Sequence, residues 1–303
     1  MIRRLAWLAF IPLILTACSS DDPLADPADD VTAPADAQSL VVGSQQYYSN
    51  EIIAELYATA LEEAGYTVER EYQIGQREVY MPEIEAGAID VFPEYGGNLL
   101  QYLDPETQAV DTATITSGLE AALPEGVRAL SPAEATDQDS YTVTQATAEE
   151  YDLVSIADLA NLDQPITVAA NTEFETRPYG PPGLEQVYGV RAEVLAVEDS
   201  GGPLTLRALL DGQADAADIY TADPAIATND LVVLEDPQNL ILPQQVTPLV
   251  SAKVDEGAAA IIDAIQAELT SEELQQLNAR SVDEQERSDV IAQDWLRSKG
   301  LID

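Results

Sequence analysis

Histidine is absent from the 303 residues, and lysine occurs only as Lys253 and Lys299. The chain therefore lacks the commonest general base, a Ser-His-Asp triad and most types of zinc site. Cys18 is the only cysteine, which excludes an intramolecular disulfide and a metal site built from cysteines. Paired carboxylates remain possible, but no spacing singles out one pair among 55 acidic residues. We expect a protein that is not an enzyme, with no catalytic residues, no metal site and no cofactor.

Basic residues are scarce: 13 of them face 55 acidic residues, and the formal net charge is −42. Such a chain repels phosphate backbones, so binding to nucleic acid is excluded. A strongly acidic surface is typical of proteins that must stay soluble at high salt, and it also steers cations toward a cleft. The charge alone does not identify a ligand.

No long apolar run follows Leu15, so the chain contains no permease of its own. The N-terminus has Arg3 and Arg4, an apolar run over residues 5–15 and the sequence Leu-Thr-Ala-Cys ending at Cys18. This is the pattern of a secretory signal. A retained transmembrane helix is the weaker interpretation, because the run is too short for about 30 Å of hydrocarbon and contains a proline. Leu-x-Ala-Cys resembles the bacterial lipobox, which favours a lipid on Cys18 over an incidental cysteine beside an ordinary cleavage site.

We therefore predict a lipoprotein signal peptide over residues 1–17 and an extracytoplasmic protein anchored to the membrane by its lipid. Removal of this signal peptide takes away two arginines and no acidic residue, so the formal net charge of the mature chain becomes −44. Residues 18–38 are rich in Asp, Pro, Ala and Ser, which predicts a disordered tether. The roughly 265 residues that follow exceed what one core usually organises, which favours two lobes.

Strand and helix patterns alternate along the folded part. The first half predicts strands at 40–44, 66–72 and 89–92 with helices at 51–64 and 78–85, and the second half repeats the alternation at 166–170, 185–188, 193–197, 204–210 and 215–219. This order is typical of an α/β fold with mostly parallel sheets flanked by helices.

Residues 84–95 (IEAGAIDVFPEY) and 209–220 (LLDGQADAADIY) match each other closely. In both, Asp follows Gly by three positions and Tyr follows Asp by five. Each passage predicts a helix ended by glycine, a tight turn, a strand entered at the Asp, and a Tyr past the carboxyl end of the strand. Ligands bind at that end of open α/β sheets, so Tyr95 and Tyr220 are expected to face one crevice.

Tyrosine dominates the aromatic residues. After residue 17 only Trp295, Phe92 and Phe174 accompany 13 tyrosines. Tyrosine rings tolerate a half-wet position, and their electron-rich faces attract a quaternary ammonium, which has no hydrogen-bond donor. The alternative is that Tyr95 and Tyr220 are merely amphipathic lid residues at a sheet edge.

Motifs over nearly all of residues 40–250, in order, resemble the glycine betaine/choline/carnitine substrate-binding proteins of osmoprotectant ABC transporters. The matching stretches are VGS at 42–44, AELY at 54–57, EAGAID at 85–90, PEYGG at 93–97, DSY at 139–141, ADL at 157–159, EFETR at 173–177, PGL at 182–184, YG at 188–189 and LVVLED at 231–236. Any one of these motifs is weak, and together they are specific.

The resemblance implies a two-lobed clamshell of the periplasmic-binding-protein type (type II) that the chain crosses twice. Lobe one would hold residues 39–142 and 244–303, and lobe two residues 143–243. The implied partners are a small quaternary-ammonium solute, an ABC permease and its ATPase, with the protein acting as a monomer in osmoregulation.

The resemblance also implies an aromatic box around the ammonium head. By motif, Tyr95, Tyr141 and Tyr220 take three of its places. The family usually has a fourth Tyr in a Pro-Tyr-Asn-x-x-Pro stretch, but residues 243–248 (PQQVTP) put Gln244 there.

Arg177 matches the family's arginine for the carboxylate of a betaine, for which a planar guanidinium is suited; an ordinary surface ion pair is the alternative. Gln45 stands where several relatives carry Lys, and Asn98 where Thr is common. Asp139 of the Asp-x-Tyr segment completes the predicted ligand site. These departures leave open a different small polar solute, such as an amino acid or ectoine, and a cell-surface lipoprotein without a transport role.

Overall fold

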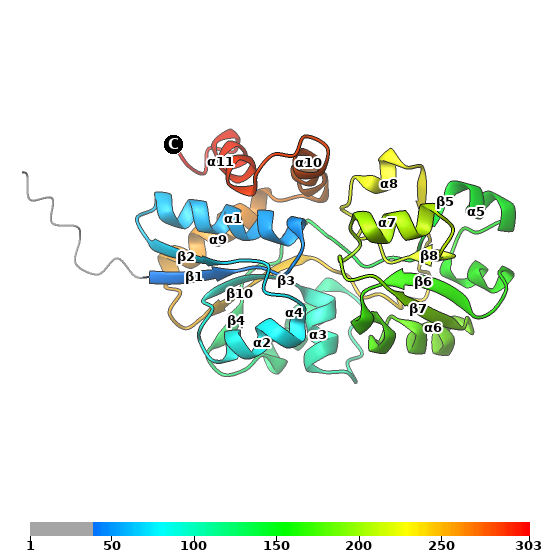
Figure 1. Ribbon diagram of the computed structural model, residues 1–303. Helices are drawn as coiled ribbons and strands as arrows, with labels where there is room; N and C mark the ends of the chain where they lie inside the picture. The colour runs from blue at the N-terminus through cyan, green and yellow to red at the C-terminus, as the bar shows by residue number, and fades with distance from the viewer. Residues whose placement is uncertain (1–38) are drawn as a thin grey trace, which may run out of the picture. The chain divides into compact units, whose positions relative to one another are not determined.

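The computed structural model describes residues 39–303, which contain two five-stranded sheets (Figure 1). The predicted signal peptide, tether and lipid attachment at Cys18 lie outside the described residues. We call lobe one the part of the chain built on the sheet β2-β1-β3-β10-β4, and lobe two the part built on β7-β6-β8-β5-β9. The lobe boundaries drawn from the sequence stay a prediction.

The strands of lobe one are β1 (Ser39–Gly43), β2 (Thr67–Glu71), β3 (Val91–Tyr95), β4 (Val127–Ala129) and β10 (Val246–Ser251). Its helices are α1 (Tyr48–Glu63), α2 (Arg77–Glu85), α3 (Gly96–Leu103), α4 (Thr112–Ala122), α9 (Glu256–Glu268), α10 (Ser271–Val282) and α11 (Ser288–Ser298). Helices α1, α9, α10 and α11 cover one face of this sheet, and α2, α3 and α4 cover the other (Figure 1).

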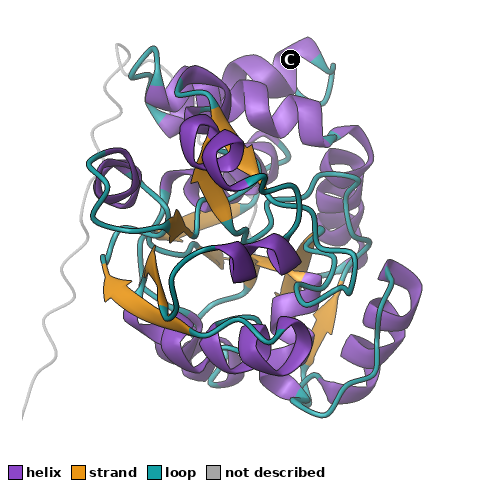
Figure 2. Ribbon diagram, turned by 90° about the vertical axis from the view of Figure 1, so that its right-hand side faces the viewer, coloured by secondary structure: helices purple, strands orange, loops and turns teal. Residues whose placement is uncertain are grey.

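The strands of lobe two are β5 (Thr142–Thr144), β6 (Ile166–Ala170), β7 (Ala192–Ala196), β8 (Ala216–Ala217) and β9 (Leu231–Val233). Its helices are α5 (Gln145–Tyr151), α6 (Pro181–Tyr188), α7 (Pro203–Leu210) and α8 (Ala225–Thr228), with 3₁₀ helices η1 (Ile156–Asn161) and η2 (Thr172–Thr176). Figure 2 shows helices above and below the strands.

The two sheets share one plan. β1 is parallel to β2 and β3, and β6 is parallel to β7 and β8. The fourth strand of each sheet, β10 or β5, runs antiparallel to both of its neighbours. These two strands come directly after the chain has passed from one lobe to the other. The predicted α/β class with mostly parallel sheets is confirmed, with one reversed strand in each sheet.

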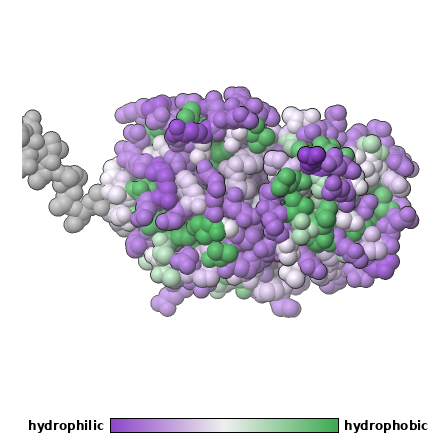
Figure 3. All heavy atoms as spheres, in the orientation of Figure 1, coloured by the Kyte–Doolittle hydropathy of each residue, from purple (hydrophilic) through white to green (hydrophobic). Residues whose placement is uncertain are grey.

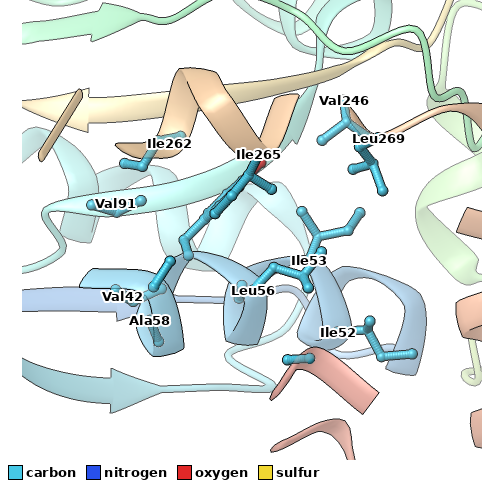
Figure 4. Packing of buried hydrophobic residues seen from close by; sticks show 14 of the residues in the cluster. Val42, Ile52, Ile53, Leu56, Ala58, Val91, Val246, Ile262, Ile265 and Leu269 are labelled. Carbon is cyan, nitrogen blue, oxygen red and sulfur yellow. The ribbon is translucent and has the colours of Figure 1, made fainter. Parts of the chain in front are cut away.

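Helix α1 forms the centre of the lobe-one core because most of its residues are buried. Its polar residues Glu51, Glu55, Thr59 and Glu62 recur along one side, and the remaining sides are largely apolar. It packs against α9, α10 and α11. Figure 4 shows Ile53 and Leu56 of this helix among side chains of α9 and of the sheet. Its apolar residues Ile52, Ile53, Leu56 and Ala58 are at most 1 % exposed.

The two matching passages fold in the same way. Gly87 and Gly212 adopt positive φ values of 71° and 68°, a conformation that favours glycine. Asp90 Oδ2 then accepts from the Val41 N–H at 3.0 Å, and Asp215 Oδ2 accepts from the Thr167 N–H at 2.7 Å. Each Asp thus fixes its strand beside a parallel neighbour, β1 in lobe one and β6 in lobe two. The Tyr five positions later therefore lies at an equivalent point of both sheets.

The face drawn in Figure 3 is mostly hydrophilic, as an acid-rich composition requires. Among residues 39–303, no helix has the length and apolar character needed to cross a bilayer.

The start of α3 lies directly against the segment that returns from lobe two. A Cβ on Gly97 would stand 2.6 Å from the Pro243 carbonyl oxygen and 2.7 Å from Leu242 Cβ. We expect Gly97→Ala to lower the free energy of unfolding by roughly 1–3 kcal/mol, because the backbone has to move. Gly96→Ala is the control: its Cβ would lie 3.1 Å from the Ile115 methyl and 3.3 Å from the Thr247 hydroxyl, both on side chains that can rotate, and the nearest backbone atom, the Gln245 oxygen, is 3.9 Å away. Urea denaturation showing equal losses would contradict this account.

Candidate ligand-binding site

A small cavity lies at the carboxyl ends of strands from both lobes. Gln45 comes two residues after β1 and Tyr95 ends β3, while Asn171 follows β6 and Tyr220 lies three residues past β8. Its volume is about 40 Å³, against roughly 10–15 Å³ needed for one water, so it suits a small solute. Its wall is formed by Gln45, Tyr47, Gln76, Arg77, Tyr95, Asn98, Asp137, Asp139, Asn171, Glu173, Phe174, Arg177, Tyr179, Asp218 and Tyr220.

Three tyrosine rings cluster in this wall. Tyr47 stacks on Tyr95 with ring centroids 6.4 Å apart and meets Tyr220 edge-on at 5.0 Å. Burial raises the pKa of all three hydroxyls, so the rings stay neutral at ordinary pH. The rings come from both lobes, and together they present aromatic surface to anything held between the sheets.

Three buried carboxyl groups share the cavity. Asp137 accepts hydrogen bonds from Ser49 Oγ at 2.8 Å and the Ala222 N–H at 3.1 Å, but burial outweighs these bonds and raises its pKa to about 7. Burial also raises the pKa of Asp139 and Asp218, which hydrogen-bond to each other. Such a bond needs a proton between the two groups. Within residues 39–303, no group of three His, Cys, Asp or Glu side chains is placed to hold a metal ion.

Both arginines of the wall are engaged by glutamates. Arg77 donates to Glu94 through Nε at 2.7 Å and Nη2 at 2.8 Å, in a pair that is almost wholly buried. Arg177 of lobe two donates to Glu78 of lobe one at 2.6 and 3.1 Å. The second pair therefore also joins the lobes.

Most of the side chains predicted from the sequence meet in this wall: Tyr95, Tyr220, Arg177, Gln45, Asn98 and Asp139. Tyr141 and Gln244 do not. Tyr141 is buried in the core of lobe two, where its hydroxyl donates to the Tyr179 carbonyl oxygen at 2.8 Å. Gln244 lies behind the wall residue Asn98. Its Oε1 accepts from the Asn98 N–H at 3.1 Å, and its amide donates to Asn98 Oδ1.

Gln244 thus orients Asn98, whose Nδ2 donates to Asp139 Oδ2 at 2.5 Å. Its influence on the cavity is indirect. The role of every predicted residue in binding a ligand stays a prediction.

Sequence reasoning missed several wall residues, above all Tyr47, Asp137, Asp218 and Arg77. The sequence position of Tyr47 could have indicated its place in the wall, because it lies four residues after β1, at the same sheet edge as Tyr95. Asp218 lies inside the second matching passage, two residues before Tyr220. Asp137 and Arg77 carry no local pattern that distinguishes them from surface charges.

Comparison with known proteins gives consistent matches. The model of the substrate-binding domain of ABC-type glycine betaine transport systems matches residues 38–298. The glycine betaine-binding protein YehZ of Escherichia coli K12 is 28% identical over 89% of this chain and 94% of its own length. A glycine-betaine-binding protein of Pseudomonas aeruginosa is 25% identical over 89% of this chain and 90% of its own length.

A crystal structure described as a glycine betaine/carnitine/choline ABC transporter superposes with a TM-score of 0.68 at 18% identity, covering 87% of this chain and 100% of the other. At this identity the superposition demonstrates the fold.

The buried Asp137 makes stability depend on pH. Its ordinary pKa of 3.8 rises to about 7 on folding, so its contribution is complete below about pH 4 and is lost as pH rises through 7. Between pH 5 and pH 8 we expect the free energy of unfolding to fall by roughly 2–3 kcal/mol more in the native protein than in Asp137→Asn. Urea denaturation across this range measures both curves, and parallel curves would refute the assignment.

Proposed function

The chain belongs to the family of substrate-binding domains of ABC-type glycine betaine transport systems, and on that basis we propose that it captures a quaternary-ammonium osmoprotectant such as glycine betaine, choline or carnitine. The family consists of solute-binding proteins of ABC transporters. In our proposal the solute is held between the lobes and then passed to a membrane permease driven by its ATPase.

The observation that carries the proposal is the cluster of Tyr47, Tyr95 and Tyr220 beside buried carboxyl groups. A quaternary ammonium offers no hydrogen-bond donor, so it gains most from aromatic faces and from nearby negative charge. In our proposal Tyr47 takes the place in the cage that the sequence analysis assigned to Tyr141, because Tyr47 lines the cavity and Tyr141 does not. Tyr179, which is 5 % exposed and lies in the same wall, adds a further ring.

Contacts between the lobes support capture by closure. Gln46 Nε2 and Gln76 Nε2 of lobe one donate to Ser200 Oγ of lobe two at 2.8 and 3.3 Å. The Tyr48 hydroxyl donates to Asp223 Oδ2 at 2.9 Å. These bonds form only when the lobes are together, which is the arrangement that encloses a solute.

We further propose that the mature protein is a monomer held outside the cytoplasm by a lipid on Cys18, with residues 18–38 as its tether. This part rests on the signal and lipobox patterns of the first eighteen residues. An anchored binding protein stays close to its permease, which raises the rate of delivery.

The first test is truncation of the cage. Tyr95→Ala and Tyr220→Ala should each weaken binding of choline or glycine betaine by about 1–2 kcal/mol or more, because a cation–π contact in a desolvated site is lost. Titration calorimetry measures the affinity, and thermal unfolding confirms that each variant is folded. Tyr102→Ala is the control, since Tyr102 is 37 % exposed on α3. Unchanged affinity in both cage variants would remove these rings from the site.

The second test concerns the anchor. Cys18→Ser should abolish lipidation and release the protein from the membrane fraction of its cells, because no other cysteine can take the lipid. Mass spectrometry of the native protein should find acyl groups on an N-terminal Cys18. A native protein cleaved elsewhere and free of lipid would contradict the proposal.

A further inference from the structure

Two buried polar atoms in the cavity wall lack a hydrogen-bond partner in residues 39–303. They are Gln45 Nε2, a donor, and Glu173 Oε2, an acceptor. Buried polar atoms are nearly always paired in folded proteins, so two such atoms in one wall call for an occupant. One atom donates and the other accepts, so an occupant that satisfies both must offer a hydrogen-bond acceptor and a hydrogen-bond donor.

Both residues are held firmly by their backbones. Gln45 is 7 % exposed, its N–H donates to Asn50 Oδ1 at 2.8 Å, and its carbonyl accepts from Ser44 Oγ at 3.0 Å. Glu173 lies on η2, where its carbonyl accepts from Thr176 Oγ1 at 3.2 Å. Neither side chain is used by the scaffold around it.

Both arginines of the cavity wall are already paired with carboxylates. Arg77 and Arg177 each face a glutamate, Glu94 and Glu78, through two hydrogen bonds. In residues 39–303 no ion pair involves any carboxyl group of the wall, namely Asp137, Asp139, Asp218 or Glu173. The wall therefore has an excess of negative charge even when Asp139 and Asp218 hold a proton between them.

From this chemistry we infer that the preferred solute is a quaternary-ammonium alcohol of the choline class, and that Glu173 selects its hydroxyl. The inference rests on the proposed function and narrows it. One hydroxyl donates to Glu173 Oε2 and accepts from Gln45 Nε2, so it satisfies both atoms. The carboxylate of a betaine only accepts, and it is repelled by Glu173 in a site without a free cation.

The experiment is titration calorimetry of the purified protein with four probes: choline, glycine betaine, tetramethylammonium and ethanolamine. Choline should bind about tenfold or more tightly than glycine betaine, because it gains a hydrogen bond to a charged group and avoids a like charge. Tetramethylammonium, which lacks the hydroxyl, should bind more weakly than choline. Ethanolamine keeps the hydroxyl without the methyl groups and tests the aromatic cage.

The decisive variant is Glu173→Gln. It should weaken choline binding by about tenfold and leave glycine betaine unchanged or tighter, so that the preference between the two disappears. Glu175→Gln is the matched control, since it removes the same charge from the exposed side of the same short helix. It should change neither affinity.

Equal or tighter binding of glycine betaine in the native protein would overturn the inference, as would identical behaviour of the two variants. The proposed function would survive either result. Different results would contradict the proposed function itself: no binding of either choline or glycine betaine, or binding of ethanolamine as tight as that of choline.

Discussion

The carboxylate of Glu94 is fully buried, and it accepts from the two nitrogens of Arg77, from the Tyr80 hydroxyl at 2.6 Å and from the Tyr95 N–H at 2.8 Å. A buried charge is tolerated only with such complete pairing. The bonds join α2 to β3, and they tie Arg77 to the strand that ends in Tyr95; both residues line the cavity. Because Glu78 follows Arg77 on the same helix, this junction also determines where lobe one can meet Arg177. Much of the site geometry thus depends on one carboxylate outside it.

If the lobes capture their solute by closing, as proposed above, ligand affinity and closure are not separate properties. Arg177 lines the cavity and also bonds Glu78 across the lobes, and Gln76 lines it while donating to Ser200. In that mechanism a solute that alters these side chains also changes the balance between open and closed forms. Measured affinity therefore includes the free energy of closure as well as the contacts with the solute.

What the sequence predicts well is what depends on local pattern. The Gly-Asp-Tyr spacing places Tyr95 and Tyr220 correctly at the sheet edge, because the turn and the Asp hydrogen bonds are built from neighbouring residues. Tyr141 and Tyr47 depend instead on which side of a connecting segment faces the cavity, which only packing decides. A buried acid such as Asp137 looks like any surface acid in a chain with 55 of them. The fold was thus more predictable than the lining of its cavity.

The reversed strand β10 lies between β3 and β4 inside the lobe-one sheet, and all six of its residues are buried. Residues 39–129 therefore cannot complete their sheet until residues 246–251 join it. Whenever the chain emerges from its N-terminus, lobe one stays unfinished until residue 251 is available. The order of strands therefore makes completion of lobe one depend on a segment from the far end of the chain.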